Sequence, residues 1–302
     1  MTSAILSEPP ATRVSSSAAP KVRYNTVKVD DVDIFYREAG ASTSPVLLLL
    51  HGFPTSSNMF RNVIVQLART FRVIAPDYPG YGFSGMPDHK TFEYTFANMT
   101  EVMDKFVKKL SLERYIVYLM DYGAPIGLRL ALKHPEQIAG LIVQNGNAYE
   151  EGLREFWDPI KKYWKEPTPE NFKGLFLDDP NAIKWQYTNG VPDLTLLDPV
   201  TWTVDKCLMD RLGNAEIQLD MLYDYGTNPP LYPDFQAFFR KYQPPTLIVW
   251  GKNDTVFPAE GAVPYKRDLP EAEIHLIDTG HFALETHADE IVSYIQEFFG
   301  PR

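Results

Sequence analysis

Residues 115–127 read Tyr-Ile-Val-Tyr-Leu-Met-Asp-Tyr-Gly-Ala-Pro-Ile-Gly, an apolar run of strand length that passes straight into a helical segment. Gly123 and Ala124 are the small residues that let a strand and the helix after it approach closely. The pattern predicts a nucleophile elbow, a strained turn that lifts one side chain above a sheet, and the lifted residue is Asp121. Taken alone, Asp121 is more simply explained as a helix N-cap, so its chemistry depends on the rest of the chain.

Uniformly apolar runs of strand length recur along the chain, at Val46–Leu50, Phe71–Ala75, Leu141–Val143, Thr246–Trp250 and Ile274–Ile277. Such strands are typical of a parallel sheet that helices cover on both faces, and helical segments separate several of them, at 59–69, 95–110 and 125–133. Alternating residues between Tyr24 and Tyr36 predict antiparallel strands with one exposed face at the start. The fold class is therefore α/β, with a mostly parallel sheet flanked by helices.

The strand–helix alternation stops between about Glu150 and Tyr232 and resumes at Pro244. Four tryptophans lie in this interval among helical fragments and prolines, at Trp157, Trp164, Trp185 and Trp202. An aromatic insertion near the carboxyl ends of the strands is expected to form a helical cap over a substrate pocket. We predict a flexible tail over 1–23, a first core part over 24–149, a cap over 150–232 and a second core part over 233–302.

The composition excludes several classes of protein. The chain has 302 residues, 29 Lys and Arg against 39 Asp and Glu, and a formal net charge of −10, so nucleic acid and anionic membrane are not expected as partners. No apolar stretch approaches the roughly 20 residues that span a bilayer, and we expect a cytoplasmic protein. The single cysteine, Cys207, excludes an internal disulfide and is expected to be packed within the cap.

Two more residues follow strand ends in the chain order that an elbow nucleophile requires. Asp254 comes after the strand 246–250, and His281 comes after the strand 274–277. Both should lie at the edge of the sheet where the elbow points, which makes a triad of nucleophile, acid and histidine. The backbone N–H groups of Phe53 and Tyr122 are the expected oxyanion-hole donors. No metal or organic cofactor is expected, because these groups suffice for the chemistry.

His51 and a glycine-rich stretch beside the predicted site are interpreted as structural. His51 follows the strand 46–50 and is expected to order the loop that carries Phe53. The glycine-rich stretch 77–85 (Asp-Tyr-Pro-Gly-Tyr-Gly-Phe-Ser-Gly) lacks the Lys-Ser/Thr of a phosphate loop and the spacing of a dinucleotide site. It predicts tight turns beside the pocket.

A carboxylate nucleophile points to a reaction at saturated carbon. It needs no base for the attack, and displacement of a leaving group gives an alkyl ester on the enzyme. Water that His281 deprotonates, with Asp254 orienting the ring, would then attack the carbonyl carbon of Asp121.

The motifs His51–Pro54, Asp77–Ser84, Met120–Gly123, Gly251–Asp254 and Gly280–Phe282 resemble, over residues 24–299, the haloalkane dehalogenase and epoxide hydrolase branch of the α/β-hydrolase superfamily. The resemblance implies an α/β-hydrolase fold with Asp121 as nucleophile and Asp254 and His281 as the base pair. Haloalkane dehalogenases generally have tryptophan after the nucleophile to bind halide, whereas this chain has Tyr122. Fluoroacetate dehalogenases usually have arginine there, which disfavours that activity.

The resemblance leaves the leaving group open. Epoxide hydrolases use two cap tyrosines to protonate the ring oxygen, and the predicted cap offers several aromatic candidates, namely Tyr163, Trp185, Tyr187, Tyr223, Tyr225 and Tyr232. Leu119, two residues before the nucleophile, is closer to the dehalogenase pattern. The favoured hypothesis is hydrolysis of an epoxide on a small apolar or aromatic substrate, with haloalkane dehalogenation as the alternative.

Two other functions remain as rivals. A serine ester hydrolase would need one of Ser56, Ser57 or Ser84 as nucleophile, although none of them occupies an elbow. A ligand-binding relative that keeps the fold without turnover is disfavoured by the intact triad. No feature of the sequence specifies an oligomeric state.

Overall fold

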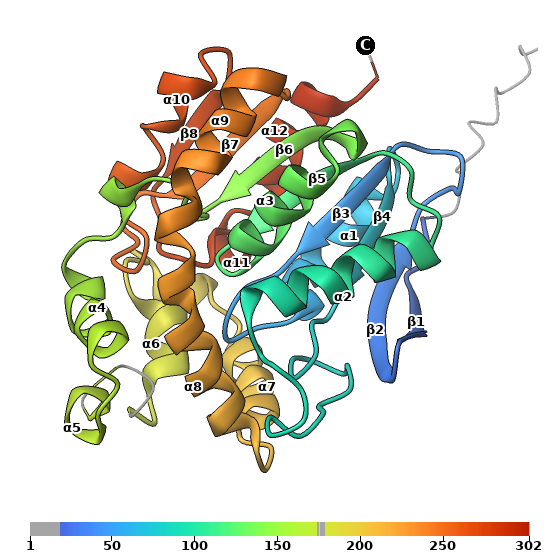
Figure 1. Cartoon of the computed structure of the whole chain (residues 1–302). Helices are drawn as coiled ribbons and strands as arrows, with labels where there is room; N and C mark the ends of the chain where they lie inside the picture. Colours follow the sequence, from blue (N-terminus) through green and yellow to red (C-terminus); the bar gives the residue numbers. More distant parts are fainter. Residues whose placement is uncertain (1–18, 174, 176–178, 302) are drawn as a thin grey trace, which may run out of the picture.

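The computed structural model describes residues 19–173, 175 and 179–301, so most of the predicted tail lies outside the described residues. Its eight strands form one sheet in the order β1-β2-β4-β3-β5-β6-β7-β8 (Figure 1). Their bounds are β1 Arg23–Val29, β2 Val32–Ala39, β3 Val46–Leu50, β4 Arg72–Pro76, β5 Tyr115–Met120, β6 Ile138–Gln144, β7 Thr246–Gly251 and β8 Glu273–Ile277. Only the two pairings of β2, with β1 and with β4, are antiparallel, and the predicted α/β class is confirmed.

Helices cover both faces of the sheet because its central strands are apolar on both. Leu48 and Leu50 of β3 belong to a hydrophobic cluster with residues of α2 (Phe96–Lys109), α3 (Gly123–Lys133) and α9 (Tyr232–Tyr242). Leu47 and Leu49 point to the opposite face, in a second cluster with α1 (Arg61–Leu67) and α12 (Ala288–Phe299). Successive residues of a strand point to opposite faces, so one apolar run holds both helical layers.

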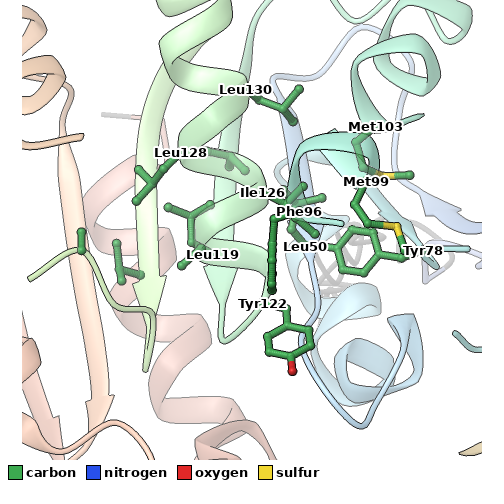
Figure 2. Close-up of a cluster of buried hydrophobic side chains, with 14 of the residues drawn as sticks. Leu50, Tyr78, Phe96, Met99, Met103, Leu119, Tyr122, Ile126, Leu128 and Leu130 are labelled. Atoms are coloured by element: carbon green, nitrogen blue, oxygen red, sulfur yellow. The ribbon is translucent and has the colours of Figure 1, made fainter. Parts of the chain in front are cut away.

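The strand–helix unit around the elbow is packed tightly. Figure 2 shows Leu119 of β5 with Ile126, Leu128 and Leu130 of α3 in the buried cluster, and Tyr122 where strand and helix join. A Cβ on Gly127 would lie 2.2 Å from Leu119 Cδ2, so a larger residue there would force the Leu119 side chain to move.

The described residues between β6 and β7 form helices and no strand. These are α4 (Asp158–Lys165), α5 (Pro169–Phe172), α6 (Ala182–Thr188), α7 (Val200–Met209) and α8 (Asn214–Asp224), followed by α9, with short 3₁₀ turns between some of them. In Figure 1, α4 to α8 gather at one end of the sheet. Two short helices, α10 (Tyr265–Asp268) and α11 (Ala283–Thr286), lie later in the chain. None of the helices in the described residues is long and apolar enough to cross a membrane.

The expectation for Cys207 was wrong, because its side chain is exposed on α7. The buried face of α7 carries Thr201, Asp205 and Met209, which recur at intervals of four residues. Cys207 lies two residues from both Asp205 and Met209, which puts it on the opposite side of the helix.

Helices α6 and α7 meet the core around a buried carboxyl group. The ring of Tyr187 stacks on Phe282 with centroids 4.0 Å apart, and its hydroxyl donates to Asp205 Oδ2 over 2.5 Å. The pKa of Asp205 is raised to about 7, mainly by burial and also by the charge of Glu285, although the hydroxyls of Tyr187 and Thr55 and the charge of Arg61 lower it. Asp205 is therefore largely protonated below neutral pH in the folded protein.

This placement predicts that Asp205 makes stability depend on pH. An unfolded aspartate has a pKa of about 3.9. Between pH 4 and 7, Asp205 in the folded chain therefore keeps a proton that it has released in the unfolded chain. The free energy of unfolding should therefore fall as pH rises, by about 2 kcal/mol between pH 5 and 7, relative to Asp205→Asn, whose amide does not titrate. Urea denaturation of both chains from pH 5 to 8 measures the difference, and parallel curves would contradict the prediction.

Candidate active site

Asp121 sits at the junction of β5 and α3 in a left-handed backbone conformation, with φ +50°. Such a conformation is costly for a residue other than glycine and persists only where the surroundings enforce it. Here glycines allow the backbone to close around it: a Cβ on Gly123 would lie 2.3 Å from the Leu50 carbonyl oxygen, and a Cβ on Gly52 would lie 2.3 Å from Asp121 Oδ1. This is the geometry of a nucleophile elbow.

Two backbone donors converge on one oxygen of Asp121. The N–H of Phe53 donates to Asp121 Oδ1 over 2.7 Å, and the N–H of Tyr122 donates to the same oxygen over 2.6 Å. The structure thus brings together both predicted oxyanion-hole residues and the predicted nucleophile. The other oxygen, Oδ2, lies 3.8 Å from His281 Nε2.

His281 and Asp254 form a buried pair. His281 Nδ1 lies 2.7 Å from Asp254 Oδ2, and both side chains are almost fully buried. His281 Nε2 has no hydrogen-bond partner among the described residues and is the ring nitrogen that lies near Asp121. The 27 residues between Asp254 and His281 in the sequence therefore do not separate them in space.

Asn145, which sequence reasoning missed, holds Asp254 in place. It follows β6 in a left-handed conformation with φ +43°, and its Nδ2 donates to Asp254 Oδ2 over 2.7 Å. Its Oδ1 accepts from the N–H of Gly251 over 2.9 Å. The available signal was a run of polar and small residues, Gln144–Asn147, after a buried strand.

Burial and the neighbouring charges set the protonation of Asp121 and His281. Burial raises the pKa of Asp121 to about 6, although the charge of His281 and the two backbone donors lower it. Burial lowers the pKa of His281, but the charges of Asp254 and Asp121 and the hydrogen bond to Asp254 outweigh it, so the net shift is upward. Above about pH 6 the Asp121 carboxylate is ionised and can act as a nucleophile.

His51 orders the loop that carries Phe53, as its position in the sequence predicted. Its Nε2 accepts from the backbone N–H of Tyr78 over 3.2 Å, and its Nδ1 lies 2.9 Å from the Gly52 carbonyl oxygen. Burial lowers the pKa of His51 to about 3, so the ring is neutral and Nδ1 carries the hydrogen.

The glycine-rich stretch 77–85 forms tight turns around Asp77. The two Asp77 carboxylate oxygens accept from the N–H groups of Ser57 and Phe83. Gly82 has φ +51°, and a Cβ there would lie 2.0 Å from Asp77 Oδ2. The serines of the ester-hydrolase alternative have structural contacts: Ser84 donates to the Asp77 carbonyl oxygen, and Ser56 and Ser57 accept from Asn58 N–H and Arg37.

Aromatic side chains form a connected cluster beside Asp121 and His281. Phe257 lies 5.9 Å from the His281 ring, Trp157 lies 5.3 Å from Phe257, and Tyr225 lies 4.5 Å from Trp157. The ring of Tyr225 is in turn 5.7 Å from that of Tyr122. These side chains are almost fully buried, so the surroundings of Asp121 and His281 are largely apolar.

Only some of the predicted cap aromatics belong to this group. Tyr225 contacts Tyr122, and Asp121 is among the groups that raise its pKa, after burial and Tyr232. Tyr232 accepts a hydrogen bond from Asn147 Nδ2 over 3.3 Å and forms another with Tyr225. The other candidates make contacts elsewhere: Tyr163 with the half-exposed Tyr223, Trp185 with Phe156, and Tyr187 with Asp205.

No group of His, Cys, Asp and Glu in the described part of the chain is arranged to hold a metal ion.

Residues 45–288 match the family model described as alpha/beta hydrolase fold, and the chain belongs to this family. It is a hydrolase with haloalkane dehalogenases among its relatives. It is 47% identical to the uncharacterized hydrolase YNR064C of Saccharomyces cerevisiae, over 91% of this chain and 98% of that protein. It is also 27% identical to haloalkane dehalogenase 2 of Mycobacterium tuberculosis, over 88% of this chain and 91% of that protein.

The solved structures agree with the fold. The haloalkane dehalogenase DbeA from Bradyrhizobium elkani superposes with a TM-score of 0.75 at 20% identity, over 92% of this chain and 99% of that one. The predicted resemblance to the α/β-hydrolase superfamily is confirmed.

The contacts of Asn145 predict how its variants will lose stability. Asn145→Gly removes the hydrogen bonds to Gly251 and Asp254. It should lower the free energy of unfolding by about 1–3 kcal/mol, because the Gly251 N–H and the Asp254 carboxylate stay buried and lose this partner. Asn145→Ala should cost about 1 kcal/mol more, because alanine tolerates the left-handed conformation poorly. Urea denaturation measures both variants, and equal stability of the two would show that the backbone strain at residue 145 is negligible.

Proposed function

We propose that this enzyme hydrolyses epoxides of small apolar or aromatic compounds through an ester on Asp121, with residues 150–232 as the cap over the site. The observation that carries the proposal is the position of Tyr225, whose ring contacts Tyr122 directly after the nucleophile. A carboxylate nucleophile and a phenol near it are the two groups that ring opening requires.

In the first step, Asp121 Oδ2 attacks a ring carbon and the carbon–oxygen bond of the epoxide breaks. The departing oxygen takes the proton of Tyr225, which leaves a hydroxyalkyl ester on Asp121 and a tyrosinate at Tyr225. Burial keeps Tyr225 protonated at neutral pH, because it raises the pKa of the phenol.

In the second step, His281 Nε2 takes a proton from water, and the hydroxide attacks the ester carbonyl carbon. The carbonyl oxygen is Oδ1, and the N–H groups of Phe53 and Tyr122 that already bind it would hold the oxyanion. The intermediate expels the diol oxygen, which the His281 imidazolium protonates. The regenerated carboxylic acid loses its proton, and this proton returns to Tyr225 through solvent.

Haloalkane dehalogenation is the second candidate, and the names of the dehalogenase relatives favour it. Against it stands the chemistry of halide binding, which needs N–H donors that are free to face the leaving group. The indole N–H of Trp157 donates to the Val256 carbonyl oxygen over 2.7 Å, and that of Trp164 donates to the Leu222 carbonyl oxygen over 2.8 Å. Both donors are already used within the protein.

Trapping of the ester tests the proposal directly. In a His281→Gln variant the hydrolytic step should be blocked, so an epoxide such as styrene oxide should leave an adduct on Asp121. Intact-mass spectrometry should show an increase equal to the whole epoxide, because ring opening loses no atom. A haloalkane would instead add its mass less that of the hydrogen halide.

Asp121→Asn in the same His281→Gln background is the matched control and should form no adduct. An adduct from haloalkanes and none from epoxides would transfer the proposal to dehalogenation. Release of an alcohol from carboxylic esters by the Asp121→Asn chain would point to a serine nucleophile and overturn it.

The ionisation of Asp121 predicts a pH dependence for ester formation. The carboxylate is the nucleophile and its pKa is about 6, so the rate should fall about tenfold per pH unit below that value. In His281→Gln the apparent pKa should be 6 or higher, because the charge of His281 lowers the pKa of Asp121. Adduct formation followed from pH 5 to 8 gives the profile, and a rate that stays constant down to pH 5 would exclude a carboxylate with this pKa.

A further inference from the structure

The segment that carries Tyr225 is tied to the helix behind the nucleophile by one arginine. Arg129 lies on α3, and its Nη1 donates to Asn228 Oδ1 over 2.6 Å. Its Nη2 donates to Thr227 Oγ1 over 3.3 Å. Nη1 also donates to the Pro125 carbonyl oxygen on α3 itself over 3.2 Å, which fixes the side chain against its own helix.

A second contact joins the same segment to the core. Asp224, which directly precedes Tyr225, accepts from the N–H of Phe96 at the start of α2 over 2.6 Å. The Arg129 guanidinium lies 5.8 Å from the centroid of the Phe96 ring, and the Phe96 ring meets both Tyr122 and Tyr225 edge to face. Residues 224–228 are therefore held from α2 on one side and from α3 on the other.

Arg129 keeps its positive charge although its side chain is largely buried. The side chain is largely enclosed, and burial lowers its pKa to about 10, although Asp224 raises it. It remains a cation at neutral pH, with Asp224 as a nearby opposite charge. A buried cation with oriented donors fixes geometry more firmly than an apolar side chain of the same size would.

We propose that Arg129 is a positioning residue that sets where the Tyr225 hydroxyl lies relative to Asp121. Asp121 lies two residues before the start of α3 and Arg129 lies within α3, so one helix connects Asp121 to the Tyr225 segment. The inference rests on the proposed function, because it assigns to Arg129 the alignment of the ring-opening proton donor. Loss of Arg129 should affect only the formation of the ester, because hydrolysis of the ester depends on His281 and Asp254.

The expected result is a slow first step with an unchanged second step. Arg129→Met should slow ester formation about 10–100-fold, because a displacement near 1 Å at a reacting group costs this much. The decay of the ester after removal of the epoxide, measured with His281 intact, should match the parent enzyme. The rate of ester formation is read by quenched-flow intact-mass spectrometry with styrene oxide.

Arg211→Met is the matched control. Arg211 also joins the helices between β6 and β7 to the core, since it donates to the Gly80 carbonyl oxygen over 2.9 Å and to that of Leu208 over 2.8 Å. It makes none of the hydrogen bonds described for residues 224–228, so its loss should leave the rate of ester formation within about twofold.

The decisive measurement combines Arg129→Met with Tyr225→Phe. If Arg129 acts through Tyr225, the double variant should form the ester no more slowly than Tyr225→Phe alone. If Arg129→Met slows the reaction equally in both backgrounds, or in neither, the inference is wrong. Should Arg129→Met fail to fold, Asn228→Ala removes the same contact from the other side and should give the same pattern.

Failure of the proposed function has a different signature. In that case Tyr225→Phe would form the ester at the parent rate, or His281→Gln would give no adduct with epoxides at all. The inference about Arg129 fails on its own when Tyr225→Phe slows ester formation but Arg129→Met either has no effect on that rate or slows it equally in the Tyr225→Phe background.

Discussion

The structure around the site depends on how the Asp121 carboxylate is held. Its backbone has φ +50°, and one of its oxygens receives two backbone N–H groups from different loops. Each donor imposes a further requirement: Gly52 must lack a side chain so that the loop after β3 can reach Asp121, and Gly123 must lack one so that α3 can begin beside β3. The N–H of Phe53, in the loop after β3, can reach Asp121 after β5 because these two strands are neighbours in the sheet.

The core could be predicted because its information is local. β5 was expected at Tyr115–Leu119 and spans Tyr115–Met120, because a continuous apolar run between polar residues specifies a buried strand. The proximity of Asp254 and His281 to Asp121 could be predicted because parallel strands bring their carboxyl ends to one edge of the sheet, whatever the separation in sequence.

The contacts of the segment between β6 and β7 could not be predicted, because they depend on long-range partners. Tyr187 was a candidate for the pocket, but its hydroxyl donates a hydrogen bond to the buried carboxyl group of Asp205. No periodic pattern in the sequence predicts that pairing. Asn145 and Arg129 were missed for the same reason. Each is a polar residue whose importance comes from residues about 100 positions away in the chain, and single-sequence patterns carry no signal for such pairs.

The two halves of the proposed reaction depend on separate parts of the scaffold. His281, Asp254 and Asn145 follow β8, β7 and β6 and are joined by hydrogen bonds among the ends of neighbouring strands. Tyr225 depends instead on α2 and α3 through Asp224 and Arg129. Asp121 is the residue common to both, since it lies between β5 and α3. Under the proposed reaction, changes in the segment around Tyr225 would therefore alter proton donation to the leaving group while the hydrogen bonds of His281 and Asp254 stay intact, so one fold can serve different substrates.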